Sequence, residues 1–238
     1  MATSKARKLK DYIESKIQKG HSYIGVPIKN WSSSDILSMQ RLAHSHGFPM
    51  EWLANLINFE SGGTFNPSIQ NSIGATGLIQ FLPSTAKGLG TYTSQLRQMS
   101  VKAQLSYVDK YISRALKNKG VLKSDGMVKD TFTQQDLFMT IFYPVAVGKP
   151  SYVFPSHVQR ANSGIRTPKD YTDKALRSAP FKGIPSSVTA YKKMFGKIEG
   201  GGGLKGGGVL KNILIFGSLS LVVIGSAVAL AYYSRAKT

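Results

Sequence analysis

The segment of residues 58–86, "NFESGGTFNPSIQNSIGATGLIQFLPSTA", holds a single acidic residue, Glu60. Upstream of it, Pro49 can begin a helix, and the sequence "MEWLANLINFE" that follows places Trp52, Leu56 and Glu60 four residues apart on one face. The residues after Glu60 are rich in Gly, Ser and Asn, which end helices and form turns. The sequence therefore predicts an apolar helix that ends in a carboxyl group and is followed by a long loop.

The position of Glu60 at the end of an apolar helix suggests a chemical role for its carboxyl group. A carboxyl group against apolar walls is costly to ionise, so its pKa should rise, and it can then serve as a general acid near neutral pH. The alternative is an ordinary amphipathic helix with an exposed terminal Glu. The loop favours the first interpretation, because "GATGLIQFLP" returns the chain through small residues that let a polymer approach the backbone. We expect Ser84 to cap the next helix.

The order of residues in this segment also resembles a known family. The matching positions are Glu60-Ser61, Asn66-Pro67, Gly74 to Pro83 (GATGLIQFLP) and Ser84-Thr85-Ala86. They are similar to the signature of the soluble lytic transglycosylases, which are related to goose-type lysozymes. The resemblance implies a lysozyme-like fold that is mainly α.

Three later stretches extend the resemblance. "QLSYVDKYI", residues 104–112, is similar to the second helical motif of the family, and "NSGIRTPKDY", residues 162–171, is a weaker echo. "FYPVAVGKP", residues 142–150, stands where the family usually has Ala-Tyr-Asn-Ala-Gly. There Tyr143 keeps the aromatic hydroxyl, but Pro144 replaces the usual Asn.

The resemblance implies cleavage of the MurNAc-GlcNAc bond of peptidoglycan without water, which leaves a 1,6-anhydromuramyl product. Glu60 would act first as acid and then as base, with the N-acetyl group of the sugar assisting. The substrate-binding residues that we expect are Ser61, Gly77, Leu78, Gln80 and Tyr143. Ser61 and Gln80 could equally serve only to hold the loop together.

Two other functions stay open. A goose-type muramidase would use the same Glu60 but add water, and would need a second carboxylate to position it. A non-catalytic structural protein of a virion membrane would bind the wall or the genome by charge alone. Because the four His residues do not share a helix face and no nucleotide-binding motif is present, we expect no metal and no cofactor.

The rest of the chain before residue 200 is predicted to be mainly helical. Apolar residues recur at helical spacing after Ser100, a potential cap, and Gly120 offers a stop. Two further helices are predicted over 133–143 and 185–195.

A boundary follows at "GGGGLKGGG", where side chains almost vanish. Beyond it, 213–233 carries no charge and is long enough, as a helix, to cross about 30 Å of hydrocarbon. The domains that we predict are a basic N-terminal extension with a helix (1–47), a single catalytic domain (48–199), a Gly-rich linker (200–211), a transmembrane helix (212–234) and a short basic tail (235–238).

The net charge and the composition limit the classes of partner that the protein is expected to bind. Lys and Arg number 31 against 12 Asp and Glu, a net charge of +19 that favours anionic cell-wall polymers, lipid headgroups or nucleic acid. Cysteine is absent, and the basic start lacks the apolar run of a secretory signal. We expect a single-pass protein of a bacteriophage virion membrane, in contact with other virion or capsid proteins and acting in genome entry. A bacterial tail-anchored enzyme is the alternative.

Overall fold

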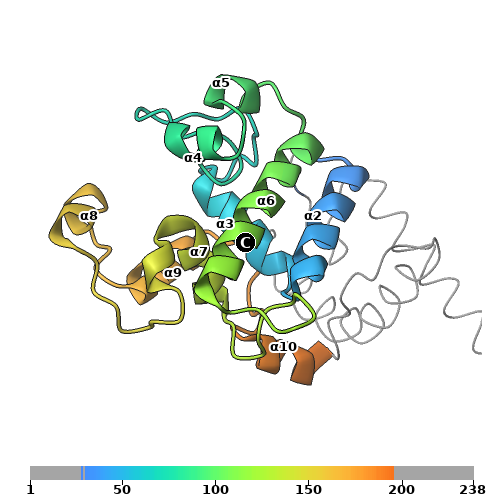
Figure 1. Ribbon diagram of the computed structural model, residues 1–238, viewed down its shortest axis with the longest axis vertical. Coiled ribbons are helices and arrows are strands. Elements are labelled where there is room, and N and C mark those ends of the chain that lie inside the picture. Colours follow the sequence, from blue (N-terminus) through green and yellow to red (C-terminus); the bar gives the residue numbers. More distant parts are fainter. Residues whose placement is uncertain (1–27, 29, 196–238) are drawn as a thin grey trace, which may run out of the picture.

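The computed structural model of the protein describes residue 28 and residues 30–195 (Figure 1). These residues form helices and loops, with isolated β-bridges but no strand among them, so the prediction of a mainly α fold is confirmed for this part of the chain. The helices are α2 (Ser33–His46), α3 (Met50–Glu60), α4 (Pro83–Gly88), α5 (Thr93–Leu96), α6 (Val101–Lys119), α7 (Gln134–Phe142), the 3-10 helix η1 (Pro144–Ala146), α8 (Ser156–Ala161), α9 (Pro168–Arg177) and α10 (Val188–Phe195).

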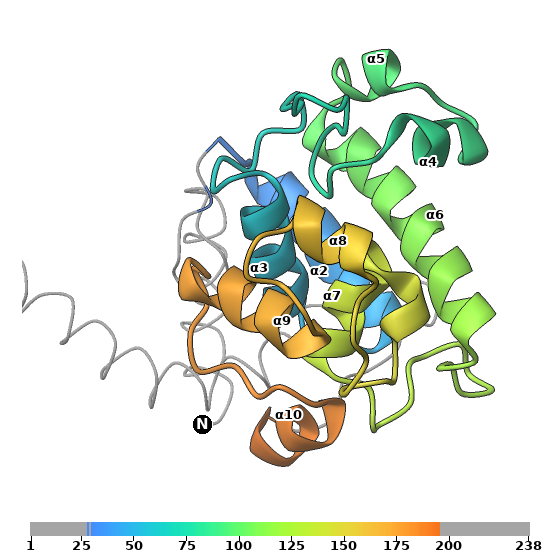
Figure 2. The same cartoon turned by 90° about the vertical axis from the view of Figure 1, so that its left-hand side faces the viewer.

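Helix α3 lies at the centre of the fold. All residues from Met50 to Asn58 are buried, and α2, α7 and α9 pack around the helix (Figure 2). A helix that is covered on every side needs apolar residues all round, and "MEWLANLINF" provides most of them. The helix was expected to bury one face, but it is enclosed, and only its last turn reaches partly exposed surroundings.

Local capping explains where the helices begin. In α2, α7 and α9, a Ser or Thr cap exchanges hydrogen bonds with an Asp three residues later: Ser32 with Asp35, Thr133 with Asp136 and Thr167 with Asp170. The predictions for α6 are confirmed, since Ser100 caps it and Gly120 ends it with a φ of 62°.

Two predicted helix starts need correction. Ser84 does not cap α4, because Leu82 is the cap and Pro83 is the first helical residue, which places Ser84 inside the first turn. Proline suits that first position, since its missing N–H would have no partner there. The last helix begins at Val188 and not at Pro185, whose carbonyl accepts a hydrogen bond from Trp52 Nε1.

The packed unit extends N-terminal of residue 48, where we expected the catalytic domain to begin. Ile28, Trp31, Ile36 and Met39 belong to the same hydrophobic core as α3. Helix α2 packs against both α3 and α6, and Trp31 Nε1 donates to the carbonyl of Phe65 at 2.9 Å. The segment before α3 is thus part of the fold that holds Glu60.

Polar side chains of α3 bind the segment between α9 and α10. Asn55 exchanges two hydrogen bonds of 3.0 Å with the backbone of Phe181, and Asn58 Nδ2 donates to the carbonyl of Ser178 at 3.0 Å. Trp52 adds its 2.9 Å bond to Pro185. The central helix is therefore fixed by residues more than a hundred positions later in the chain.

The predicted linker (200–211), transmembrane helix (212–234) and basic tail (235–238) lie outside the described residues, as does most of the N-terminal extension. Within residues 28 and 30–195, none of the helices is both long and apolar enough to cross a membrane.

Candidate active site

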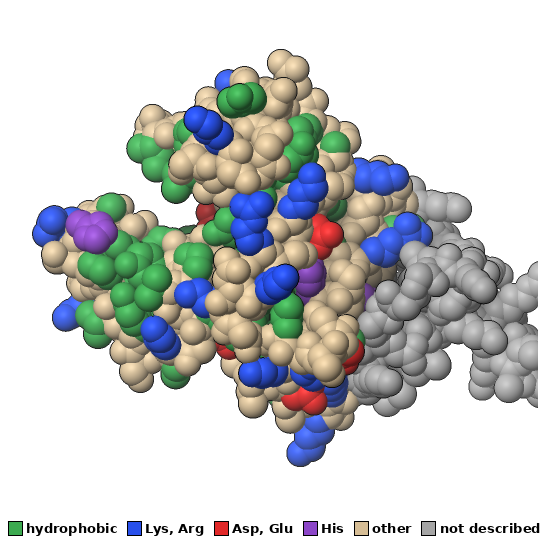
Figure 3. Space-filling model, in the orientation of Figure 1, with side chains coloured by type: hydrophobic (Ala, Val, Ile, Leu, Met, Phe, Trp, Pro, Cys, Tyr) green, Lys and Arg blue, Asp and Glu red, His purple; other side chains and the backbone are tan. Residues whose placement is uncertain are grey.

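Glu60 is the last residue of α3 and is partly exposed, whereas the residues of this helix from Met50 to Asn58 are buried. The space-filling view shows a hollow between the part of the molecule that carries α4 and α5 and the part that carries α8, with an acidic side chain at its base (Figure 3). Because Glu60 ends α3 and is partly exposed, this helix brings one carboxyl from the core to the molecular surface.

Tyr171 of α9 binds this carboxyl. Its hydroxyl donates a short hydrogen bond to Glu60 Oε1. The Tyr171 ring is buried and is held by aromatic neighbours: Phe142 stacks on it with centroids 4.3 Å apart, and Phe59 and Phe138 meet it edge to face at 5.2 and 6.3 Å. This packing leaves the hydroxyl little freedom and so fixes one oxygen of Glu60.

The electrostatics agree with the predicted acid. Burial raises the pKa of Glu60 to about 7, although the hydrogen bond from Tyr171 acts to lower it. Burial and the nearby charge of Glu60 raise the pKa of Tyr171 well above its usual range, so Tyr171 stays a neutral donor. Near neutral pH the carboxyl therefore exists in both its protonated and its ionised form and can both give and take a proton.

Tyr111 of α6 is a second phenol near the carboxyl. Burial raises its pKa, and the charge of Glu60 raises it further. Its ring meets Phe81 of the loop edge to face at 6.3 Å. Helices α3, α6 and α9 therefore converge at Glu60, each with one polar side chain.

Among the residues predicted from the motif, Ser61 and Gln80 hold the loop. Ser61 is fully buried and its Oγ accepts from the backbone N–H of Phe65 at 2.9 Å. Gln80 has a φ of 51°, and its Nε2 donates to the carbonyl of Gly77 at 3.1 Å. These bonds support the loop-holding role; contact of either side chain with substrate stays a prediction.

Gly77 and Leu78 are positioned by Gln104 of α6. Gln104 Oε1 accepts from the N–H of Leu78 at 2.6 Å, while its Nε2 donates to the carbonyls of Pro67 and Leu96 at 2.8 and 3.0 Å. Gly77 has a φ of 84°, and a Cβ there would lie 2.3 Å from Gln104 Oε1. Leu78 is buried in the core, so what it can offer a substrate is its backbone.

Tyr143 lies just beyond α7, where Pro144 begins η1. Its ring packs against Tyr152 and Phe154, with centroids 5.8 and 5.3 Å away. The residue before it, Phe142, is the one that stacks on Tyr171. The hydroxyl that binds Glu60 is thus that of Tyr171, and a substrate contact of Tyr143 stays a prediction.

Three residues of the site, Gln104, Tyr111 and Tyr171, were not among those predicted, although each lies in a stretch that resembles the family. Tyr171 ends "NSGIRTPKDY", and Gln104 and Tyr111 lie in "QLSYVDKYI". Both stretches resemble the family, but nothing in spacing alone shows that residues 111 positions apart meet at one carboxyl.

No group of three or more His, Asp and Glu side chains within the described ranges is arranged to hold a metal ion.

Comparison with known families gives an independent result. Residues 38–119 match the Transglycosylase SLT domain, a stretch that runs from within α2 to the end of α6 and includes Glu60, the loop and Gln104. This part of the chain is therefore similar to the lytic transglycosylases, and the match supports a peptidoglycan-cleaving activity. Neither a curated protein nor a solved structure matches the chain.

Proposed function

We propose that the chain is a peptidoglycan lytic transglycosylase that cleaves the MurNAc-GlcNAc bond and leaves a 1,6-anhydromuramyl end. The observation that carries the proposal is Glu60 itself: one carboxyl with a pKa of about 7, held by Tyr171 at the end of a buried helix inside the SLT-like segment.

The reaction uses one carboxyl twice. Protonated Glu60 donates its proton to the glycosidic oxygen, the bond from that oxygen to C1 breaks, and the N-acetyl oxygen of the muramyl sugar stabilises C1. The resulting carboxylate then takes the proton of the 6-hydroxyl, whose oxygen bonds to C1 and displaces the N-acetyl oxygen. Since Tyr171 engages Oε1, Oε2 is the oxygen free to exchange the proton with the sugar.

The surroundings of Glu60 favour this lyase over a muramidase. Hydrolysis with water ordinarily uses a second carboxylate beside the acid. In the described part of the chain, burial and the bond from Tyr171 account for the pKa shift of Glu60, and no neighbouring acid contributes to it. One carboxyl with substrate assistance is sufficient for the anhydro product.

The location that we propose is a virion membrane of a bacteriophage, where the enzyme opens the wall during genome entry. The support is the uncharged segment 213–233 behind a glycine-rich tether, together with the net charge of +19. These features would keep a catalytic domain on a membrane and close to an anionic wall.

Replacing Glu60 with Gln tests the reaction. The amide keeps the shape but cannot donate the proton, so release of fragments from purified peptidoglycan should fall by at least about a thousandfold. The measurement is mass spectrometry of the soluble products made by the full chain. Wild-type products should be lighter by one water than the corresponding reducing fragments.

A matched control is Asp125→Asn, which also removes one negative charge but can keep the bond from Met127 N–H to Oδ1 of residue 125. It should cleave like the wild type. Products with reducing ends would establish a muramidase instead. If the folded wild-type chain binds the wall but releases nothing, it is a binding protein.

A further inference from the structure

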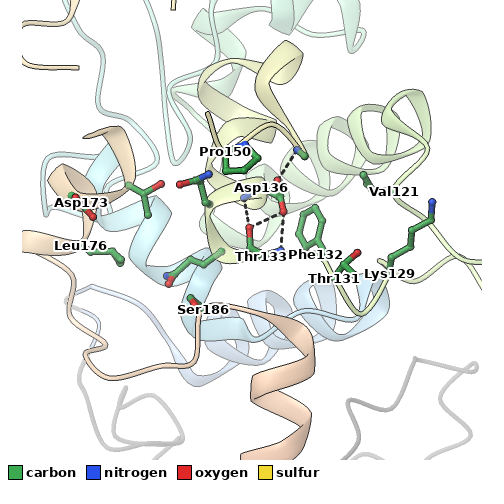
Figure 4. Close-up of a pocket in the computed structure, with 14 residues that line it drawn as sticks. Val121, Lys129, Thr131, Phe132, Thr133, Asp136, Pro150, Asp173, Leu176 and Ser186 are labelled. Carbon is green, nitrogen blue, oxygen red and sulfur yellow. Dashed lines mark hydrogen bonds between the residues drawn. The ribbon is translucent and has the colours of Figure 1, made fainter. Parts of the chain in front are cut away.

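A second cavity lies at the other end of α7 from the catalytic pair. It has a volume of about 560 Å³ and lies between the start of α7, α9 and the loop before α7 (Figure 4). Glu60 and Tyr171 are not among its lining residues. Phe142, which stacks on Tyr171, is the last residue of α7, whereas Gln134, which lines this cavity, is the first.

Gln134 is the unusual feature of the cavity. The residue is 3% exposed, and its side-chain Nε2 is buried without a hydrogen-bond partner among the described residues. A buried amide donor without a partner is destabilising, and such groups are rare in folded proteins. A ligand that brings an acceptor oxygen to Nε2 would satisfy this donor.

The nearby carboxylate of Asp136 already has hydrogen-bond donors from the protein and does not need a bound cation. It accepts from the N–H and hydroxyl of Thr133 at 3.0 and 2.7 Å, and from the N–H of Gly148 at 2.7 Å. Asp173, at the other side of the cavity, is paired with Lys169. Of the buried side-chain atoms of the lining residues, Gln134 Nε2 is the one without a partner among the described residues, and because it is a donor, the ligand must supply an acceptor.

Lys129 and the apolar walls of the cavity further restrict the chemical class of ligand that could bind there. Lys129 is exposed and lies at one end of the cavity (Figure 4). Its ammonium forms no ion pair with any residue in the part of the chain that the structure describes. Phe132, Pro150 and Leu176 add apolar wall. A short peptide that contains alanine supplies all three groups: a carbonyl for Gln134, methyl groups for the apolar walls and a carboxylate for Lys129.

We propose that this cavity binds the short acidic peptide that peptidoglycan carries on its glycan strand, separately from the glycan at Glu60. The proposal rests on the proposed function for the identity of the polymer. Gln134 Nε2 donates to a peptide carbonyl, and Lys129 pairs with the terminal carboxylate. Binding there would hold a strand on the protein through a second point.

The test is binding of the synthetic peptide N-acetyl-L-Ala–γ-D-Glu–L-Lys–D-Ala, whose blocked N-terminus mimics its attachment to the glycan, to the full chain in detergent micelles, measured by isothermal titration. Gln134→Met removes the donor at similar volume, and should weaken binding at least about tenfold. Its melting temperature without peptide should equal or exceed that of the wild type, because the unpaired donor is gone. Gln98→Met, the same change at an exposed glutamine outside the cavity, should bind like the wild type.

Lys129→Met provides a second test at an exposed position. It should weaken binding of the peptide with a free C-terminal carboxylate, but not of the same peptide with a C-terminal carboxamide. Equal binding of both peptides by the wild type, or unchanged affinity in Gln134→Met, would overturn the proposal.

The experiments distinguish a failure of the peptide-site proposal from a failure of the proposed transglycosylase function. A wild-type chain that cleaves peptidoglycan but does not bind the peptide would refute the peptide site and leave the enzyme. Glu60→Gln should bind the peptide normally, because Glu60 does not line the cavity. A chain that binds the peptide through Gln134 but never cleaves would refute the enzyme and leave the site.

Discussion

Glu60 experiences two opposing influences, and their balance sets its proton affinity. Burial disfavours the charged form, while the hydroxyl of Tyr171 stabilises it. Burial prevails, since the pKa is raised to about 7. Without Tyr171 the carboxyl would hold its proton more tightly and would be a weaker acid toward the glycosidic oxygen.

Replacing Tyr171 with Phe tests this balance. Loss of the hydrogen bond should raise the pKa of Glu60, so activity should fall with rising pH at a higher midpoint than in the wild type. Because an ionised carboxyl loses a charge-assisted bond, activity at the optimum should drop about ten- to hundredfold. The measurement is the pH profile of kcat/KM on purified peptidoglycan.

Tyr143→Phe is the comparison for that experiment, since Tyr143 was the phenol that the motif indicated. The ring of Tyr143 packs against Tyr152 and Phe154. Removal of its hydroxyl should therefore leave the midpoint of the pH profile of kcat/KM unchanged. A shifted midpoint in Tyr143→Phe and an unshifted one in Tyr171→Phe would contradict the role given to Tyr171.

The carboxyl could be predicted from the sequence, whereas its partners could not. Glu60 stands out because the apolar helix and the loop around it are local features. Tyr171 reaches it through tertiary packing of Phe59, Phe138 and Phe142, which no local pattern encodes. The shape of the site thus depends on contacts between distant segments.

At the scale of elements, the loop after α3 is organised by one side chain of α6. Gln104 is fully buried and binds backbone groups of Pro67, Leu78 and Leu96. No backbone hydrogen bond is made by the N–H of Leu78 or the carbonyl of Pro67 among the described residues, and Gln104 supplies a partner to each. The backbone of the glycine-rich loop therefore packs directly against the side chain of Gln104. The closest approach is at Gly77, where there is no room for a Cβ atom.

Gly77→Ala should destabilise the fold by about 2–4 kcal/mol, because it combines a positive φ with a clash against Gln104. Gly90→Ala is the matched control, since its φ is 83° but a Cβ there would meet no atom within 4 Å. It should cost only about 1 kcal/mol. Chemical denaturation of both variants measures the difference; equal losses would show that the clash is relieved at no cost.

Helix positions were largely predictable, and their boundaries were less so. Ser100 and Gly120 delimit α6 as expected, because caps and stops are encoded within a few residues. The start of α10 was misplaced, because Pro185 is engaged by Trp52 from the central helix. Local sequence signals predict a helix boundary well unless a residue from a distant segment binds the backbone at that boundary.

At the scale of the whole molecule, charge and hydrophobicity are distributed unevenly. The net charge of +19 suits an anionic polymer, while the uncharged stretch 213–233 suits hydrocarbon. A glycine-rich segment separates the two chemistries. This arrangement is the basis for our proposal that the chain acts at a membrane facing a cell wall.

The full chain should therefore stay with membranes after washing with alkaline carbonate, and a chain ending at residue 199 should be released. Immunoblotting of the two fractions measures this. In purified bacteriophage particles treated with detergent, the protein should leave with the lipid. Recovery of the full chain in the carbonate wash would contradict the anchor, and absence from particles would favour a bacterial enzyme.

The bonds from α3 to residues 178–185 also bear on biosynthesis. A ribosome has produced Glu60 and its loop long before it produces Phe181, the partner of Asn55, or Tyr171, the partner of Glu60 itself. Contacts of such sequence separation form late, after most of the chain has emerged. A nascent or prematurely terminated chain would thus carry Glu60 without the residues that hold it, and the pair of Glu60 and Tyr171 would form only once synthesis of the domain is complete.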